Sequence, residues 1–376
     1  MVRTIDSLVA SGRDDGSWRW PGDRRWRGNL AAMSDDEVLL RIGSRELTIT
    51  HPDKVFFPER NDTKLDLIRF YVGIEEPLMA AMRDRPVLLQ RFPNGTRGSS
   101  FFQKRIPDSA PEWLTTTTVS TPNGTESRAL VIADLAHFIW AVNLGCLGFH
   151  SWPIRPGRPE VTDELRIDLD PQPGTTFAMV QETASEVLRL FSELGVTCFV
   201  KTTGNRGLHV YVRLQPHWDS YAVRSAAVVV ARELERRRPD LITAAWWKEE
   251  RGERVFIDFN QNAPHKTVFA PWSVRSRDHA PVSCPFAWDV LESIDPNALT
   301  IATVPGRIAE HGDPWATMDE APNSLDPLLE MVRADQAAGL LDAPWPPVYP
   351  KMAGEPPRVA PSRAKKTAGK TAPPPD

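Results

Sequence analysis

Two aspartates, Asp168 and Asp170, are separated by one residue within the mostly apolar run 165–171. Side chains alternate between the two faces of a strand, so on a strand both carboxylates lie on one face, with Cα atoms roughly 6.5 Å apart. An unpaired buried carboxylate is costly, whereas an oxygen-preferring divalent cation relieves both charges. The pair indicates a metal site. Two unrelated surface acids near a strand end are the alternative interpretation.

A second candidate site is the segment 201–211, in which Gly204 and Gly207 lie between two apolar runs. Glycines let backbone N–H groups approach an anion closely, and a hydroxyl, a guanidinium and an imidazole can surround that anion. These three groups would come from Thr203, Arg206 and His209. The segment predicts a phosphate-binding hairpin. A β-hairpin whose glycines serve only the turn geometry would show the same pattern.

A third acid, Asp258, stands in the apolar run 255–259. A lone aspartate there is costly unless it is ligated or hydrogen-bonded, although an outward-facing acid on a half-exposed strand is also possible. If its strand lies beside that of Asp168 and Asp170, three carboxylates converge. Such a triad can hold two divalent ions, which neutralise charge on attacking and leaving oxygens in phosphoryl transfer. Cations that could meet a triphosphate nearby are Arg251, Lys266 and Arg275.

These residues need a mixed scaffold of helices and strands. Apolar periodicity predicts helices over 63–80, 134–145, 176–194, 220–237 and 325–341. Alternating and β-branched runs predict strands over 46–50, 87–92, 165–170, 197–202, 208–214 and 254–259. The strands do not alternate regularly with the helices, and no internal repeat is visible. The pattern therefore favours an α+β layer arrangement over a doubly wound sheet.

The composition is that of an ordinary globular protein, with 376 residues, 41% hydrophobic and 25% charged. A net charge of -4 neither predicts nor forbids a nucleic-acid partner, which reads local basic patches. Unpaired cysteines, no long apolar run and no signal peptide favour the cytoplasm and no membrane contact. We expect a poorly ordered extension over 1–44, in which Met33 could be an alternative start, one domain over 45–340, and a disordered Pro/Lys-rich tail over 341–376.

Taken in order, Asp168-x-Asp170, Thr203-Gly204-x-x-Gly207-x-His209 and the apolar run with Asp258 resemble the three motifs of the archaeo-eukaryotic primase superfamily. The match is closest to the polymerase domain of bacterial ATP-dependent DNA ligase D, in its stand-alone actinobacterial form, over roughly residues 45–315. Further matching segments are 51–58, 91–95, 101–104, 150–152 and 261–262. The resemblance implies a primase-like α+β fold with mixed and antiparallel sheet layers flanked by helices.

The resemblance also implies roles for single residues. Asp168, Asp170 and Asp258 would bind two catalytic divalent cations, Mn²⁺ or Mg²⁺. The incoming nucleoside triphosphate would meet the central hairpin and a pocket around it, formed by Thr203, Arg206, His209, His150, Gln261 and Arg275, with Lys266 among the nearby cations.

DNA contacts are implied in the same way. A 5′-phosphate at a gap or break would meet Lys54 and Lys64, with His51 where an asparagine is usual. Phe101 and Phe102, beside Lys104, resemble an aromatic pair that stacks on the template. Core burial of one of the two is the alternative, since neighbours on a strand face opposite ways. Arg251 resembles a loop residue that engages a second DNA end.

We therefore expect a template-directed polymerase that fills gaps and extends ends in DNA repair by non-homologous end joining, with a preference for ribonucleotides. Its partners would be a separate DNA ligase and the end-binding protein Ku, in a cytoplasmic, nucleoid-associated setting. Thr203 and Arg206 replace a usual serine and lysine, so triphosphate affinity can differ from that of the family. Two alternatives are a non-catalytic DNA-end-binding module, tested by metal-dependent nucleotide incorporation, and a replicative primase, against which the candidate 5′-phosphate pocket argues.

Overall fold

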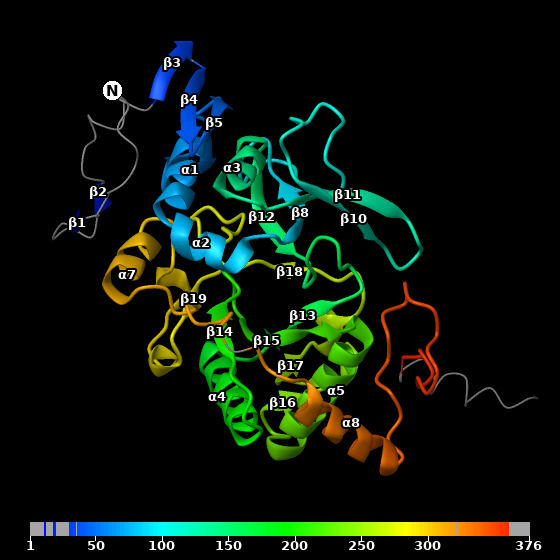
Figure 1. Cartoon of the computed structure of the whole chain (residues 1–376). Coiled ribbons are helices and arrows are strands. Elements are labelled where there is room, and N and C mark those ends of the chain that lie inside the picture. Colours follow the sequence, from blue (N-terminus) through cyan, green and yellow to red (C-terminus); the bar gives the residue numbers. More distant parts are fainter. Residues whose placement is uncertain (1–10, 13–17, 20–29, 35, 321, 361–376) are drawn as a thin grey trace, which may run out of the picture.

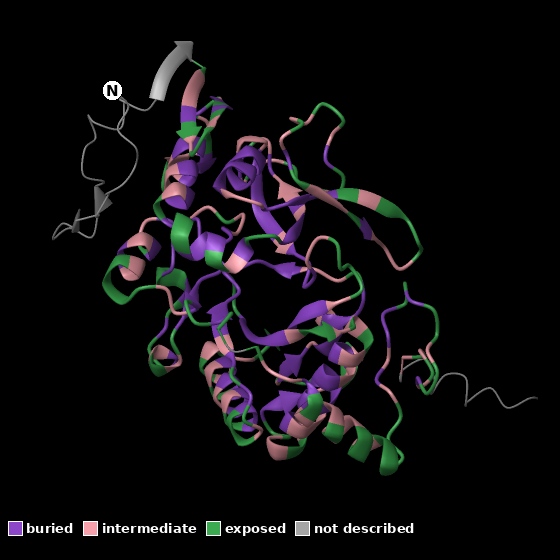
Figure 2. Ribbon diagram, in the orientation of Figure 1, coloured by how far each residue is buried: buried purple, intermediate pink, exposed green. Residues whose placement is uncertain are grey.

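The computed structural model describes residues 11–12, 18–19, 30–34, 36–320 and 322–360. Two six-stranded sheets with helices packed against them form most of this part of the chain (Figure 1). The central strands of both sheets are buried, whereas the late helix α8 (Asp326–Ala337) is largely exposed (Figure 2). The predicted α+β class is confirmed. None of the helices described is long and apolar enough to span a bilayer.

The first sheet has the strand order β10-β11-β8-β12-β18, with β9 also paired to β8, and its neighbours run antiparallel. Helix α3 contacts β12 of this sheet, and α1 packs against α3. A capping box between Thr63 and Asp66 starts α1. The bounds are β8 Pro86–Arg91, β9 Phe101–Gln103, β10 Thr116–Ser120, β11 Glu126–Val131, β12 Cys146–Ser151, β18 Val268–Phe269, α1 Lys64–Gly73, α2 Glu75–Met82 and α3 Leu135–Asn143.

The second sheet has the order β16-β17-β13-β15-β14-β19, in which the β16–β17 pair is parallel and the other described pairs are antiparallel. Helices α4 and α5 contact β13, whose Leu165, Ile167 and Leu169 are completely buried. The bounds are β13 Thr162–Pro171, β14 Phe199–Thr202, β15 Leu208–Trp218, β16 Ile242–Thr243, β17 Val255–Ile257, β19 Pro285–Phe286, α4 Phe177–Glu193 and α5 Ser220–Arg237.

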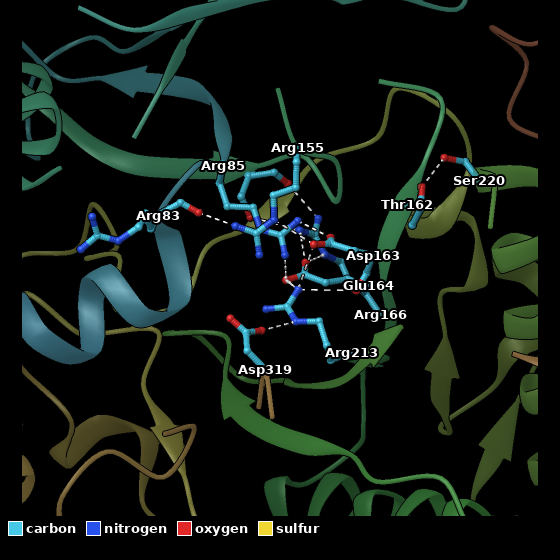
Figure 3. A network of polar contacts seen from close by, with 11 residues as sticks. Arg83, Arg85, Arg155, Thr162, Asp163, Glu164, Arg166, Arg213, Ser220 and Asp319 are labelled. Atoms are coloured by element: carbon cyan, nitrogen blue, oxygen red, sulfur yellow. Dashed lines mark hydrogen bonds and ion pairs between the residues drawn. The ribbon is translucent and has the colours of Figure 1, made fainter. Parts of the chain in front are cut away.

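The opposite face of β13 is polar and bonds to the first sheet through a buried ionic network (Figure 3). Arg85, directly before β8, donates to Asp163 and, at 2.6 Å, to Glu164. Arg166 donates to Glu164 at 2.5 Å and to the Ser151 carbonyl on β12 at 2.8 Å. Because Glu164 and Arg166 alternate with the apolar residues of β13, this face continues to Asp168 and Asp170. The network therefore ties β13, the strand of the second sheet that carries Asp168 and Asp170, to the first sheet.

The first part of the chain forms a small sheet of β3 (Leu30–Ser34), β4 (Glu37–Ile42) and β5 (Arg45–Thr50). Leu40 of β4 pairs with Leu47 of β5, and both side chains are buried. The expected boundary at residue 45 therefore cuts a hairpin, and residues 37–42 belong to the folded part. The strands β1 (Ser11–Gly12) and β2 (Trp18–Arg19) also pair, while residues 20–29 lie outside the described part of the chain.

Residues 341–360 differ from the expected disordered tail. Trp345 and Tyr349 are buried in a cluster with Ala263, and the segment runs back from α8 alongside α5 (Figure 1). The proline and lysine content predicted an unpacked chain, but two aromatic side chains provide enough apolar surface to dock it. Residues 361–376 lie outside the described part.

Candidate active site

The three predicted acids come together on two neighbouring strands. Asp168 and Asp170 occupy alternate positions of β13, and Asp258 directly follows β17, which pairs with β13 through Leu169 and Ile257. The backbone N–H of Asp258 donates to the carbonyl of Asp168 at 3.0 Å. Residue 258 is thus in register with the aspartate pair, although 90 residues separate it from the first of them in the chain (258 − 168).

The acids lie in a setting that opposes their ionisation. Burial raises the pKa of Asp168 to about 6, against the opposing effect of Lys201 and Arg275. Burial and then the nearby Asp168 raise the pKa of Asp258, also to about 6. The same two causes, in the same order, raise the pKa of Asp170. The site thus concentrates negative charge that a cation would stabilise.

Asp258 is oriented by the 3₁₀ turn η2 (Phe259–Asn262) that it caps. Its carboxylate accepts from the Asn260 amide at 3.1 Å and from the Gln261 side chain at 2.8 Å. Asn262 holds the turn against β13, because its side chain accepts from the Arg166 amide at 2.9 Å and donates to the Arg166 carbonyl at 2.7 Å. The Gln261 side chain, predicted to line the nucleotide pocket, therefore helps to orient the Asp258 carboxylate.

The glycine hairpin connects β14 to β15, as predicted, and lies against β13. A Cβ atom on Gly207 would stand 2.5 Å from the Leu169 carbonyl oxygen, so only glycine fits between the aspartates' strand and the turn. The Thr203 hydroxyl accepts from the backbone N–H groups of Asn205 and Gly207, at 3.2 and 3.3 Å. Arg206 is exposed at the tip. Both N–H groups are thus bonded within the turn, and a phosphate bound here would replace the Thr203 hydroxyl as their acceptor.

A row of basic side chains crosses the second sheet toward Asp168. Lys201 pairs with His209, and His209 pairs with Asp168, on three successive strands. The His209 Nε2 lies 3.3 Å from the Asp168 carboxylate, and the buried Lys201 ammonium donates to the Ser283 hydroxyl at 2.5 Å. Lys201 was missed in the sequence, because the carboxylate it faces, Asp168, belongs to a strand two positions away in the sheet.

Arg275 and His150 border the hairpin from the other side. The Arg275 guanidinium donates to the Thr203 carbonyl at 2.8 Å and stacks 3.5 Å from the centre of the Phe269 ring. His150 lies between the rings of Phe102 and Phe269, and its Nε2 is buried without a hydrogen-bond partner. Burial, followed by the charge of Arg275, lowers the pKa of His150 to about 3, so its ring is neutral at pH 7. This nitrogen lacks the hydrogen bond that a buried polar atom ordinarily has.

The donor chemistry fits Mg²⁺ or Mn²⁺. All three side chains supply carboxylate oxygens, which these ions prefer, and their pKa values are raised first by burial, a cost that a bound cation would offset. Within the described residues, no three acidic, histidine or cysteine side chains already form a closed metal-binding cluster. The acids therefore supply donors from two strands, without a preformed cage.

The predicted 5′-phosphate residues lie at the start of α1. Lys54 donates to Asn94 at 2.8 Å on the surface, and His51 is exposed. Lys64 is buried and donates to the carbonyls of Thr50 and Asn143, at 2.5 and 3.0 Å. Burial and then Lys54 lower the pKa of Lys64 to about 8. The structure brings the two lysines together, with Lys54 outermost.

The aromatic pair is open to solvent on both sides of β9. Phe101 is 47% exposed and Phe102 57% exposed, so core burial of one of them is wrong. The Arg91 guanidinium lies 5.1 Å from the Phe101 ring centre, and the exposed Lys104 follows the strand. Phe102 contacts His150 edge to face, with ring centres 5.5 Å apart, which connects the aromatic surface to one of the residues predicted to meet the nucleotide.

Arg251 is placed differently from the expected loop contact. It ends the short helix α6 (Lys248–Arg251), is buried, stacks on Phe256 and donates to the carbonyls of Ala245 and Trp246. The Arg251 guanidinium is attracted to the carboxylates of Asp258 and Asp170. It does not lie on an open surface where a second DNA end could contact it. Lys266, half-buried, also lowers the pKa of Asp258.

The family described as "LigD, primase-polymerase domain" matches residues 63–315, a range that includes the three acids and the hairpin. The chain belongs to this family. It is 33% identical over 306 residues to the "Multifunctional non-homologous end joining protein LigD" of Mycolicibacterium smegmatis, covering 81% of this chain and 40% of that protein. It is 31% identical to the "Bifunctional non-homologous end joining protein LigD" of Bacillus subtilis, covering 72% of this chain and 44% of that protein.

The chain thus spans less than half the length of these curated relatives. Among solved structures, the "Polymerase Domain from Mycobacterium tuberculosis Ligase D in complex with DNA" is similar with a TM-score of 0.69 and 33% sequence identity, covering 74% of this chain and 99% of that one. The primase-like fold expected from the three motifs is confirmed by this similarity.

Proposed function

We propose that this chain is a template-directed nucleotidyltransferase, in which a primer 3′-hydroxyl attacks the α-phosphorus of a nucleoside triphosphate and pyrophosphate leaves. The observation that carries the proposal is the convergence of Asp168, Asp170 and Asp258 beside a glycine hairpin and the basic side chains of Lys201, His209 and Arg275. Two divalent ions held by the three acids, Mn²⁺ or Mg²⁺, would neutralise charge on the attacking and leaving oxygens.

The chain's own residues would bind and orient the triphosphate. Arg275 holds the hairpin by its Thr203 carbonyl and brings positive charge next to the turn, while exposed Arg206 can reach a phosphate from the tip. The neutral His150 has a free buried nitrogen for a hydrogen bond to the nucleotide. The Thr203 hydroxyl would turn to a phosphate and release the N–H groups of Asn205 and Gly207, which it accepts from in the absence of nucleotide.

The DNA side of the proposal rests on two surfaces. Lys54 and Lys64 would bind a 5′-phosphate downstream of a gap, and Phe101 and Phe102 would stack against unpaired template bases. The names of the relatives include non-homologous end joining, so we extend the proposal to gap filling and end extension in that repair route. A preference for ribonucleotides, a separate ligase and Ku as partners belong to the same proposal.

Primer extension on a gapped duplex tests this function. The duplex carries or lacks a 5′-phosphate, and ribo- or deoxynucleotides are offered with Mn²⁺ or Mg²⁺. We expect the parent to extend the primer, and an Asp168→Ala/Asp170→Ala protein to bind the duplex but add no nucleotide. Because burial disfavours the ionised form of Asp168, and Asp170 is exposed at the end of β13, this protein should stay folded. Extension at the parental rate by the double variant would refute Asp168 and Asp170 as the catalytic acids, whereas a parent that binds the duplex but never extends it would leave an end-binding module.

A further inference from the structure

The chain after α8 forms a docked segment, residues 342–358, here called the C-terminal strap. Buried Glu355 closes it on itself by accepting from the backbone amides of Trp345 and Met352, at 2.8 and 3.0 Å. Tyr349 donates its hydroxyl to the Pro264 carbonyl at 2.5 Å, just past the η2 turn. The strap lies beyond residue 315, where the family match ends.

A completely buried arginine of α5, Arg224, anchors the strap. Its guanidinium donates to the Asp342 carboxylate at 2.9 and 3.2 Å and to the carbonyls of Ala343 and Pro344 at 2.9 and 3.2 Å. The Trp345 ring stacks 3.8 Å from it. A buried guanidinium is costly unless its donors are satisfied, so strap and arginine stabilise each other.

The same arginine bonds to the turn that carries the third acid. Arg224 Nε donates to the Asn260 side-chain oxygen at 2.7 Å, and the Asn260 side-chain nitrogen donates to Pro344 at 3.1 Å. The backbone N–H of Asn260 in turn donates to the Asp258 carboxylate at 3.1 Å. Asn262 holds the inner side of η2 to β13, so Asn260 and the strap hold its outer side.

We propose that the C-terminal strap is a positioning element for Asp258, acting through Arg224 and Asn260. This inference deepens the proposed function and rests on it. With the strap docked, η2 is held on both sides and the Asp258 carboxylate stays aimed at the Asp168 side of the site. Without the anchor, Arg224 loses its charge partner and Asn260 loses a fixed neighbour, so the turn gains freedom and the cation meets a less organised donor set.

Asp342→Ala tests the strap in the full chain, with Asp335→Ala as a matched control. Asp335 also pairs with an arginine of α5, Arg232, at 3.1 Å, and the two aspartates are similarly exposed, at 27% and 26%. The Asp335 pair does not include η2. Asp342→Asn keeps an oxygen acceptor for Arg224 and should restore part of the loss.

The first readout is hydrogen exchange of the 258–263 backbone without metal, nucleotide or DNA. We expect faster exchange in Asp342→Ala than in the parent or Asp335→Ala. The second is the Mn²⁺ concentration for half-maximal primer extension, which should rise several-fold in Asp342→Ala, less than the roughly tenfold or greater cost of losing a direct partner of a ligand, since two residues lie between Asp342 and Asp258. The nucleotide KM should change little, since the hairpin is not touched.

The outcomes separate the inference from the proposed function. Unchanged exchange in 258–263, or faster exchange with an unchanged Mn²⁺ requirement, would overturn the positioning role. If Asp342→Ala does not fold, Asp342→Asn supplies the same two measurements. A parent that never extends a primer would refute the nucleotidyltransferase, whereas an active parent whose strap variants match it in both readouts would refute only the strap.

Discussion

The amide of Asp258 donates to the carbonyl of Asp168 at 3.0 Å, so backbone pairing fixes the third acid to the strand of the other two. This bond is independent of the Asp258 side chain. A substitution can therefore remove the carboxylate without moving residue 258, which makes Asp258 a clean position to separate stability from activity.

Asp258→Asn should lower primer extension at least about a hundredfold, since even partners of metal ligands commonly cost that much. In EDTA at pH 7 the variant should be more stable than the parent, by up to about 3 kcal/mol, because a folded-state pKa of about 6 against 3.8 means that the ionised acid destabilises the fold. Thermal unfolding and extension assays measure both changes. Asp313→Asn, which also removes a buried acid of raised pKa, should leave extension unchanged.

The ionic network predicts a pH-dependent stability of the opposite sign. Arg85, then Arg166 and Arg213, overcome burial and hold the pKa of Glu164 at about 2, below its usual 4.5. The stabilisation is full above about pH 4.5 and is lost as pH falls toward 2. Glu164→Gln should cost about 3 kcal/mol at pH 7, as for a broken buried pair, and the difference should shrink at pH 3.

Urea unfolding at pH 7, 5 and 3 measures this difference. Glu182→Gln serves as the control, because its bond to Arg238 lies at the surface, with Glu182 53% exposed. That variant should barely differ from the parent at any pH. A constant Glu164→Gln effect from pH 7 to pH 3 would exclude the ionised carboxylate as the source of the stability.

Regular elements and local motifs were predictable from the sequence. The helices predicted over 176–194 and 220–237 are α4 and α5 to within a residue, because their apolar faces follow the helical period. The helix predicted over 63–80 is divided at Ile74 into α1 and α2. The hairpin at 204–207 was predicted from its glycines, and the structure shows why Gly207 is needed there.

Long-range polar pairs were not predictable. Glu164 and Arg85 are far apart in the chain, and a charged residue on a strand reads as a surface residue until its partner on another sheet is known. Lys201 was overlooked for the same reason, as its carboxylate neighbour belongs to a strand two positions away. The strap was hidden by its proline content, which says nothing of where Trp345 docks.

The two lysines at the candidate 5′-phosphate site should behave differently. Lys54→Ala should weaken binding to a 5′-phosphorylated gap and reduce the salt dependence of log K by about 0.9, with unchanged thermal stability. Lys64→Ala should also destabilise the fold by about 1–3 kcal/mol, since the Thr50 and Asn143 carbonyls lose their donor. Fluorescence anisotropy at several salt concentrations, paired with thermal unfolding, measures these effects.

The pH dependence of Lys54→Ala adds a check on Lys64. The pKa of Lys64 is lowered to about 8 by burial and then by Lys54, so its charge is lost as pH rises through this region. The parental affinity for the 5′-phosphate should therefore fall between pH 7 and 9, and in Lys54→Ala, where the repulsion by Lys54 is gone, the fall should begin at a higher pH. Affinity that stays level over this range, or a duplex lacking the phosphate that shows the same fall, would contradict a direct role of Lys64.

Phe102 is 57% exposed, on a strand that among the described strands pairs only with β8. A large exposed aromatic ring next to a candidate nucleotide site fits stacking on an unpaired template base. Phe102→Ala should weaken binding to a gapped template by about 1–3 kcal/mol, while thermal unfolding stays close to that of the parent. Phe102→Trp keeps a flat ring and should retain the affinity, whereas Phe102→Leu keeps the apolar character without the ring and should lose it. If the leucine variant bound as tightly as the parent, contact with the template would be merely apolar, and stacking by this residue would be excluded.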